Sequence, residues 1–208
     1  MKRNHFATMF AVLSSFAAAS ALAANAQSYQ VTGGNVGFLA IGKPSAIKIR
    51  GKGSAPQGQI QISGKEVSGE LTFDENSLNT GIDLRDRHMK EKYLQTDKNP
   101  TAKFKITKLT LPRDFTPSGF SAEKLPMEGD LTLHGETKPV KGTATIISNA
   151  GAATGHVEFG TQITDYKIDI PTYMGVKVAD HIDIDVDVQA KAAESSPASA
   201  PAQGTKKK

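Results

Sequence analysis

Strict alternation of apolar and polar residues is the feature that most limits how this 208-residue chain can fold. It is clearest at residues 181–190, where isoleucine and valine hold the even positions from Ile182 to Val188 and aspartate holds the odd positions between them. Successive side chains of a β-strand point to opposite faces, so this pattern predicts a strand with one buried and one solvated face.

The same alternation recurs along most of the chain, in short segments separated by turns rich in glycine, proline and asparagine. The apolar positions change parity between Ile106 and Leu109, which predicts a β-bulge near Lys108. We expect roughly eight or more strands, joined mostly by short turns. The predicted fold class is therefore all-β, either an antiparallel sandwich or a closed up-and-down barrel. A barrel of about eight strands is just wide enough to be packed with side chains or to hold one small ligand.

Both ends of the chain are predicted to lie outside this domain. Residues 1–26 have the features of a secretory signal peptide: Lys2 and Arg3, then an apolar stretch, then an Ala-Asn-Ala site with cleavage after about Ala26. Residues 191–208 are mainly Ala, Ser, Pro and Lys without an apolar period, which predicts a disordered tail. The folded domain is then residues 27–190, and we expect it in the periplasm.

Composition excludes several functional classes. The formal net charge is +4, but the two ends carry the excess, so the predicted domain is close to neutral and has no basic groove for nucleic acid. The chain has no cysteine, which excludes disulfides, a lipidated cysteine, thiol catalysis and cysteine-ligated metals. No segment after the signal peptide approaches a membrane-spanning length, so we expect no stable membrane insertion once the signal is removed.

Residues 78–104 interrupt the strands with the only convincing helical segment of the predicted domain. Thr80 or Asp83 is the expected helix cap, because a side-chain oxygen there can accept from a free backbone N–H. The sequence Asn-Pro at residues 99–100 ends the segment. It also holds the densest cluster of side chains able to do chemistry: Arg85, Asp86, Arg87, His88 and Tyr93.

The cluster has two interpretations. His88 and Asp86, with Arg85, could form an acid–base set. Alternatively, Arg85 and Asp86 tie the helix to the barrel rim through hydrogen bonds and an ion pair, or position a ligand head group together with His88. We favour the second interpretation, because no serine lies in a nucleophile-elbow pattern and one histidine near a carboxylate is a weak catalytic signal. We therefore predict no catalytic residues.

Metal binding is not predicted either. Asp183, Asp185 and Asp187 share one strand face, but no loop folds around an ion and no D-x-D-x-D-G pattern with a distal glutamate follows. A solvated strand face explains them better. The histidines at residues 134, 156 and 181 show no spacing shared by zinc ligands.

Four stretches resemble motifs of the YceI family of exported polyisoprenoid-binding proteins. The helical segment L-N-T-G-I-D-L-R-D-R-H-M-K-E-K-Y-L is similar to the family's T-x4-R-D-x-H-(L/M), and N-P-T-A-K-F follows it as Y-P-x-x-x-F does in the family. The hairpin G-D-L-T-L-H-G-E-T-K-P-V and the final G-V-K-V-A-D-H-I-D-I-D-V-D-V also match in order and spacing. Two departures are the missing histidine of the family's first strand and Asn99 in place of a tyrosine.

The resemblance implies a lipocalin-like, eight-stranded antiparallel barrel with one short helical insertion, whose apolar tunnel holds an isoprenoid chain. Arg85, Asp86 and His88 match the family's R-D-x-H group and would lie at one mouth, as a head-group contact or helix anchor. The residues expected to line the tunnel and bind the ligand are Phe38, Ile60, Ile62, Leu71, Phe73, Phe104, Ile106, Leu131, Leu133, Phe159, Ile182, Ile184 and Val186.

The functional expectation is periplasmic binding, sequestration or transport of an isoprenoid lipid, polyprenyl or quinone-like, without catalysis and with no cofactor other than that lipid. One alternative is a hydrolase-type enzyme that acts on a prenyl or ester substrate through His88 and Asp86. Another is a structural envelope protein with a filled barrel. Alternation alone does not decide between them, because strands of this kind usually just form a core, and a homodimer is left open.

Overall fold

The computed structural model describes residues 26–43, 47–173 and 176–193. Residues 1–25 of the predicted signal peptide and almost all of the predicted tail lie outside these residues. The described strands are β1 (Gln27–Lys43), β2 (Ile47–Gly53), β3 (Gln57–Ser63), β4 (Glu66–Asp74), β5 (Thr101–Leu109), β6 (Gly119–Leu133), β7 (Glu136–Asn149), β8 (Ala152–Gln162), β9 (Thr172–Tyr173) and β10 (Val176–Ala192). The described helical turns are η1 (Glu75–Ser77), α1 (Asp83–His88), η2 (Met89–Leu94) and η3 (Ile163–Tyr166).

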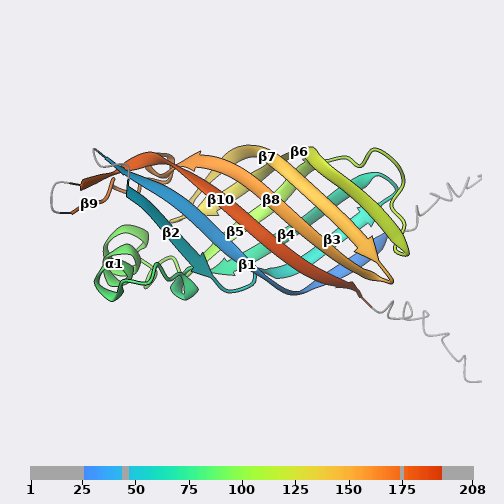
Figure 1. The fold of residues 1–208 in the computed structure, drawn as a ribbon, viewed down its shortest axis with the longest axis horizontal. Helices are drawn as coiled ribbons and strands as arrows, with labels where there is room; N and C mark the ends of the chain where they lie inside the picture. The colour runs from blue at the N-terminus through green and yellow to red at the C-terminus, as the bar shows by residue number, and fades with distance from the viewer. Residues whose placement is uncertain (1–25, 44–46, 174–175, 194–208) are drawn as a thin grey trace, which may run out of the picture.

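Antiparallel pairing closes the sheet on itself. The strand order is β2-β1-β3-β4-β5-β6-β7-β8-β10-β9, and β1 also pairs with β10, so eight strands form a closed barrel and β2 and β9 are additions to it. Figure 1 shows an elongated barrel whose strands cross its long axis obliquely, with α1 and β9 at the same end. The predicted all-β barrel with one short helical insertion is confirmed.

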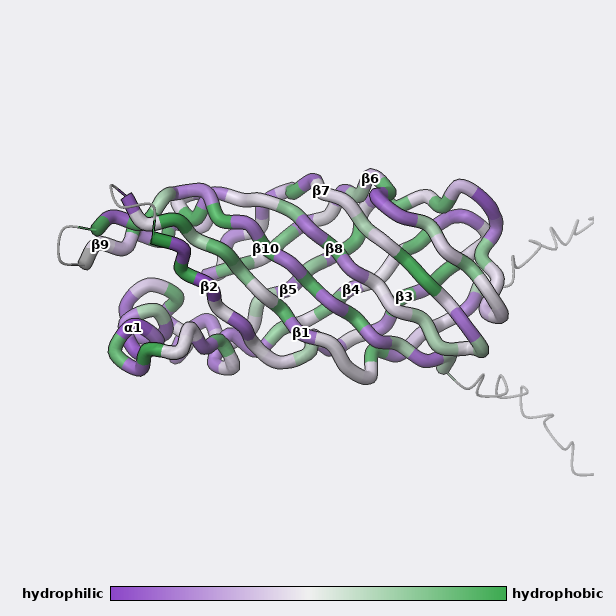
Figure 2. The backbone as a smooth tube through the Cα atoms, in the orientation of Figure 1, coloured by the Kyte–Doolittle hydropathy of each residue, from purple (hydrophilic) through white to green (hydrophobic). Residues whose placement is uncertain are grey.

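The alternation seen in the sequence decides which side chains face inward. Figure 2 shows hydrophobic and hydrophilic residues alternating along β8 and β10, as the pleat of a strand requires. The parity changes where the register shifts, and one shift lies between Ile106 and Lys108 in the pairing of β5 with β6. The bulge predicted near Lys108 is therefore confirmed.

β1 pairs with two different strands along one of its edges, and the helical insertion lies where the second of them leaves the sheet. The N-terminal part of β1 pairs with β3 and its C-terminal part pairs with β2, so β2 and β3 lie end to end along one neighbour. β3 continues to β4, whereas β2 meets the η1–α1 connection through backbone hydrogen bonds between Lys52 and Asn79 of 2.9 and 2.8 Å. Residues 75–94 thus cover the side of the barrel where β2 leaves the continuous sheet.

The end of the barrel opposite α1 is filled. Tyr29 packs edge-on against Phe115 with ring centroids 5.6 Å apart, and Phe115 lies 5.3 Å from Phe120. The backbone N–H groups of Leu111 and Phe115 donate hydrogen bonds to carbonyl oxygens of the β3–β4 turn. These bonds hold the loop between β5 and β6 over that end of the barrel. All of these residues are buried. No helix among the described residues is long and apolar enough to cross a membrane.

Candidate functional site

A large cavity of about 660 Å³ lies inside the barrel. It falls in the range of about 300–1,000 Å³ typical of small-molecule sites. All the side chains predicted to line a tunnel are found in its wall: Phe38, Ile60, Ile62, Leu71, Phe73, Phe104, Ile106, Leu131, Leu133, Phe159, Ile182, Ile184 and Val186. That these residues bind a ligand stays a prediction.

Glycines explain why four phenylalanines do not fill the interior. A Cβ built on Gly51 would collide with the ring of Phe38, and one on Gly129 would collide with the ring of Phe104. The ring of Phe73 lies in the same way against Gly53. These rings therefore occupy space that a side chain on the glycine would take, which leaves room in the middle of the barrel.

The fourth ring, that of Phe159, stacks on the ring of Phe104. Phe104 of β5 and Phe159 of β8 stack with centroids 5.4 Å apart and planes 17° apart, although β6 and β7 separate their strands. Gly142 of β7 provides the space, since its Cβ would lie 2.7 Å from the Cβ of Phe159. The two stacked rings thus meet over β6 and β7, the strands that lie between β5 and β8 in the wall.

Thr80 is the centre of the polar network at the helical end. Its backbone N–H donates to Oδ1 of Asp86 at 2.8 Å, and its hydroxyl donates to the same oxygen. Arg85 donates through Nε to the Thr80 hydroxyl at 2.7 Å and through Nη2 to the Thr80 carbonyl at 2.8 Å. Asp86 is 6% exposed. Arg85 and Asp86 therefore hold the turn before the helix. The ion pairs found among the described residues include neither of them.

The helix is shorter than the predicted segment and is capped differently. It begins at Asp83, continues as a π-helical turn and ends at Leu94, where Gln95 adopts a left-handed conformation. The cap position is Ile82, and no side chain there accepts a hydrogen bond. The prediction of Thr80 or Asp83 as cap is wrong, because the Thr80 side chain is engaged by Asp86 and Arg85.

The predicted mouth residues separate into two groups. Arg85 and His88 line the cavity, and His88 is otherwise largely exposed. Asp86 is not among the lining residues, and its hydrogen bonds go to Thr80. Thr80 and Tyr93 add a hydroxyl and a phenol to the lining at the same end.

Sequence reasoning missed Glu75. This residue begins η1, lines the cavity and is only 1% exposed, and neither of its carboxyl oxygens has a hydrogen-bond partner among the described residues. Burial, with a smaller contribution from the charge of Asp74, raises the pKa of Glu75 to about 8. The signal was present in the sequence: Leu71 and Phe73 alternate inward along β4, and Glu75 occupies the next position of the same parity.

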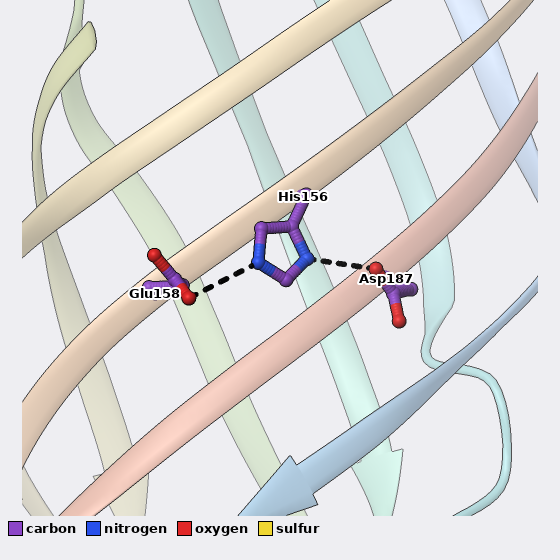
Figure 3. Close-up of polar contacts among 3 residues, drawn as sticks. All are labelled: His156, Glu158 and Asp187. Carbon is purple, nitrogen blue, oxygen red and sulfur yellow. Dashed lines mark hydrogen bonds and ion pairs between the residues drawn. The ribbon is translucent and has the colours of Figure 1, made fainter. Parts of the chain in front are cut away.

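The outer wall carries a separate charged group. The His156 imidazole of β8 lies between Asp187 of β10, with Nδ1 to Oδ1 at 2.7 Å, and Glu158, with Nε2 to Oε1 at 3.4 Å (Figure 3). The hydrogen bond to Asp187 is the main cause that raises the pKa of His156 above its usual value. Across the described part of the chain, no group of three or more histidine or acidic side chains is arranged to hold a metal ion.

Stability should depend on pH through His156. Because the folded-state pKa is raised, its stabilising contribution is fully present below the unfolded pKa of about 6.5 and is lost as pH rises through the folded value. The His156 side chain is 41% exposed, so solvent screens the pair and we expect no more than about 1 kcal/mol. Urea unfolding should show His156→Gln losing more stability relative to wild type at about pH 6 than at about pH 8.5. The Asp187→Asn variant should behave alike, and a loss independent of pH would contradict the assignment.

An antiparallel barrel closed around an apolar cavity, with a polar network at its helical end, defines the chain as a lipocalin-like barrel protein. The chain matches the family model of the YceI-like domain over residues 26–190. It belongs to the YceI family.

Curated relatives match over part of their length. A UPF0312 protein of Photorhabdus laumondii is 36% identical over a segment that covers 36% of this chain and 43% of that protein. A UPF0312 protein of Pseudomonas aeruginosa is 34% identical over 92 residues, 44% of each chain. The matched segments thus span less than half the length of these relatives.

Solved structures share the fold at low identity. A polyisoprenoid binding domain from Saccharophagus degradans, implicated in plant cell wall breakdown, has a TM-score of 0.61 at 16% identity and covers 79% of this chain and 98% of its own. Burkholderia cenocepacia BcnA has a TM-score of 0.59 at 17% identity, over 75% of this chain and 96% of its own. The Campylobacter jejuni YceI protein has a TM-score of 0.58 at 21% identity, over 70% and 86%.

Proposed function

We propose that this protein binds an isoprenoid lipid in the barrel cavity and sequesters or ferries it in the periplasm, without catalysis. The observation that carries the proposal is the cavity itself, whose wall is made almost wholly of aliphatic and phenylalanine side chains. Its similarity to a polyisoprenoid binding domain supports the same ligand class. The periplasmic location rests on the signal peptide inferred from residues 1–26.

The energetics suit a long hydrocarbon chain. Each buried CH₂ contributes about 0.8 kcal/mol, so fifteen buried carbons give about 12 kcal/mol before losses. Association and ordering cost an estimated 4–15 kcal/mol or more, which still leaves room for useful affinity. A ligand of this kind needs few polar contacts, which agrees with a cavity wall that is mainly apolar.

Binding is favoured over both alternatives. A structural protein with a filled barrel requires a packed interior, whereas this interior contains a cavity of about 660 Å³. An acid–base pair of His88 and Asp86 would have to face the substrate together, but Asp86 holds Thr80 and does not line the cavity.

The direct test is native mass spectrometry of the mature protein purified from its own cell envelope, followed by organic extraction. We expect a copurifying lipid with a prenyl chain. A protein that is ligand-free from its native envelope, and that also takes up no prenyl lipid when offered one, would refute the proposal.

A further inference from the structure

The buried carboxyl group of Glu75 has no role in the fold that the structure reveals. It forms no hydrogen bond within the described residues, although an unsatisfied buried polar group is costly and rare. Leaving such a group without a partner costs roughly 1–3 kcal/mol. The backbone of Glu75 is already fixed by its N–H donating to the Pro100 carbonyl at 2.9 Å, so the side chain is not needed to hold the turn. A group of this kind facing a cavity is matched by a ligand that supplies the missing partner.

We propose that Glu75 is the head-group site of this cavity: its carboxyl group hydrogen-bonds an uncharged ligand oxygen, a carbonyl or a hydroxyl, and disfavours a phosphorylated head group. This inference rests on the proposed function and specifies which class of isoprenoid the cavity accepts. Quinones and polyprenols both present such an oxygen at the end of a prenyl chain, whereas prenyl diphosphates present negative charge.

The chemistry of the site supports a neutral partner. With its pKa raised to about 8, Glu75 is mostly a neutral acid at pH 7, so it can donate through its O–H and accept at its carbonyl. A diphosphate brought beside it would meet a group that becomes anionic as pH rises, and like charges at short range are repulsive. The Arg85 guanidinium does not offset this fully, because its Nε and Nη2 already donate to Thr80.

Few other titratable groups lie near Glu75 and could contribute to a pH dependence of binding. Among the residues that line the cavity, the other titratable groups are Tyr29 of β1, Arg85 and His88 of α1, Tyr93 of η2 and Lys103 of β5, and Asp74 precedes Glu75 in the chain. Substituting Glu75 alone isolates its part, because these groups are kept.

The experiment uses probes with one common tail and different ends. Delipidated mature protein is titrated with geranylgeraniol, a naphthoquinone with a geranylgeranyl tail, geranylgeranyl diphosphate, and the parent hydrocarbon without oxygen. Wild-type protein should bind the alcohol or the quinone at least about tenfold more tightly than the diphosphate. Whichever neutral probe binds more tightly identifies the source of the oxygen.

Two variants test the residue. Glu75→Leu should weaken the preferred neutral probe by about three- to tenfold, towards the value for the hydrocarbon, while hydrocarbon binding holds or improves. Leucine should fold at this apolar, buried position. Glu75→Gln keeps a neutral donor and acceptor, so it should stay within about threefold of wild type at pH 7. For the quinone, the affinity of Glu75→Gln should not fall between pH 7 and pH 9, whereas that of wild type should, because an ionised carboxylate cannot donate to a carbonyl oxygen.

The outcomes separate the inference from the proposed function. If wild type binds none of the same-tail probes, the proposed lipid-binding function fails. If it binds them all alike, or binds the diphosphate best, or if Glu75→Leu keeps the wild-type preference, the role of Glu75 is overturned while lipid binding stands.

Discussion

Replacing Ala144 with tryptophan is expected to shorten the prenyl chain that this barrel accepts. Ala144 lies on the inner face of β7, is 2% exposed and lines the cavity. β7 runs from the helical end towards the filled end, so this position lies in the deeper half. An indole there would occupy space that the far end of a long chain needs. Excluding about four carbons costs about 3 kcal/mol, or roughly 100-fold in affinity.

Chain length provides the internal comparison for that variant. A geranylgeranyl tail should lose roughly 100-fold, whereas a geranyl tail that ends before Ala144 should lose less than about threefold. Thr143→Trp is the matched control, because Thr143 is the exposed neighbour on the same strand and lies outside the cavity lining. Isothermal titration with both tails measures all four combinations. Equal losses for long and short tails would indicate that the ligand does not extend along β7.

The strands and their inner faces could be predicted because a strand has a period of two. Each of the predicted tunnel residues was chosen by parity, and parity survives tertiary packing unless a bulge shifts it. The bulge at Lys108 was itself visible as a change of parity. Alternation alone does not predict closure into a barrel, since a sandwich has the same pattern.

The cavity could not be predicted from alternation, because the sequence of a filled barrel and that of a hollow one differ little. The deciding residues are glycines on the inner face, such as Gly51 and Gly129, onto which the rings of Phe38 and Phe104 lie. The pairing of Phe104 with Gly129 depends on the register of β5 with β6, which an isolated sequence does not give.

The helical insertion was predicted in place but not in detail. Its residues were found because they break the alternation, but the Thr80 network depends on how the chain turns before the helix. The alternation of apolar residues does not identify Glu75, because the residue is charged, although its parity places it inside. A charged residue that continues an inward series is therefore worth testing as a site residue.

Gly142→Ala is expected to destabilise the barrel strongly by adding one methyl group to the inner wall. The new Cβ would overlap the backbone carbonyl oxygen of Glu158 and lie 2.7 Å from the Cβ of Phe159. That carbonyl belongs to the β7–β8 ladder, so relief requires one strand to move and disturbs the stack of Phe104 on Phe159. We expect the free energy of unfolding to fall by about 3 kcal/mol, the upper end for overpacked cores, which corresponds to about 6–12 °C in Tm.

Gly155→Ala in β8 is the matched control, since its Cβ would meet Val188 at 3.9 Å, and it should stay within about 0.5 kcal/mol of wild type. Chemical denaturation of both variants measures the difference, and equal stabilities would mean that the two strands can separate at Gly142 without cost.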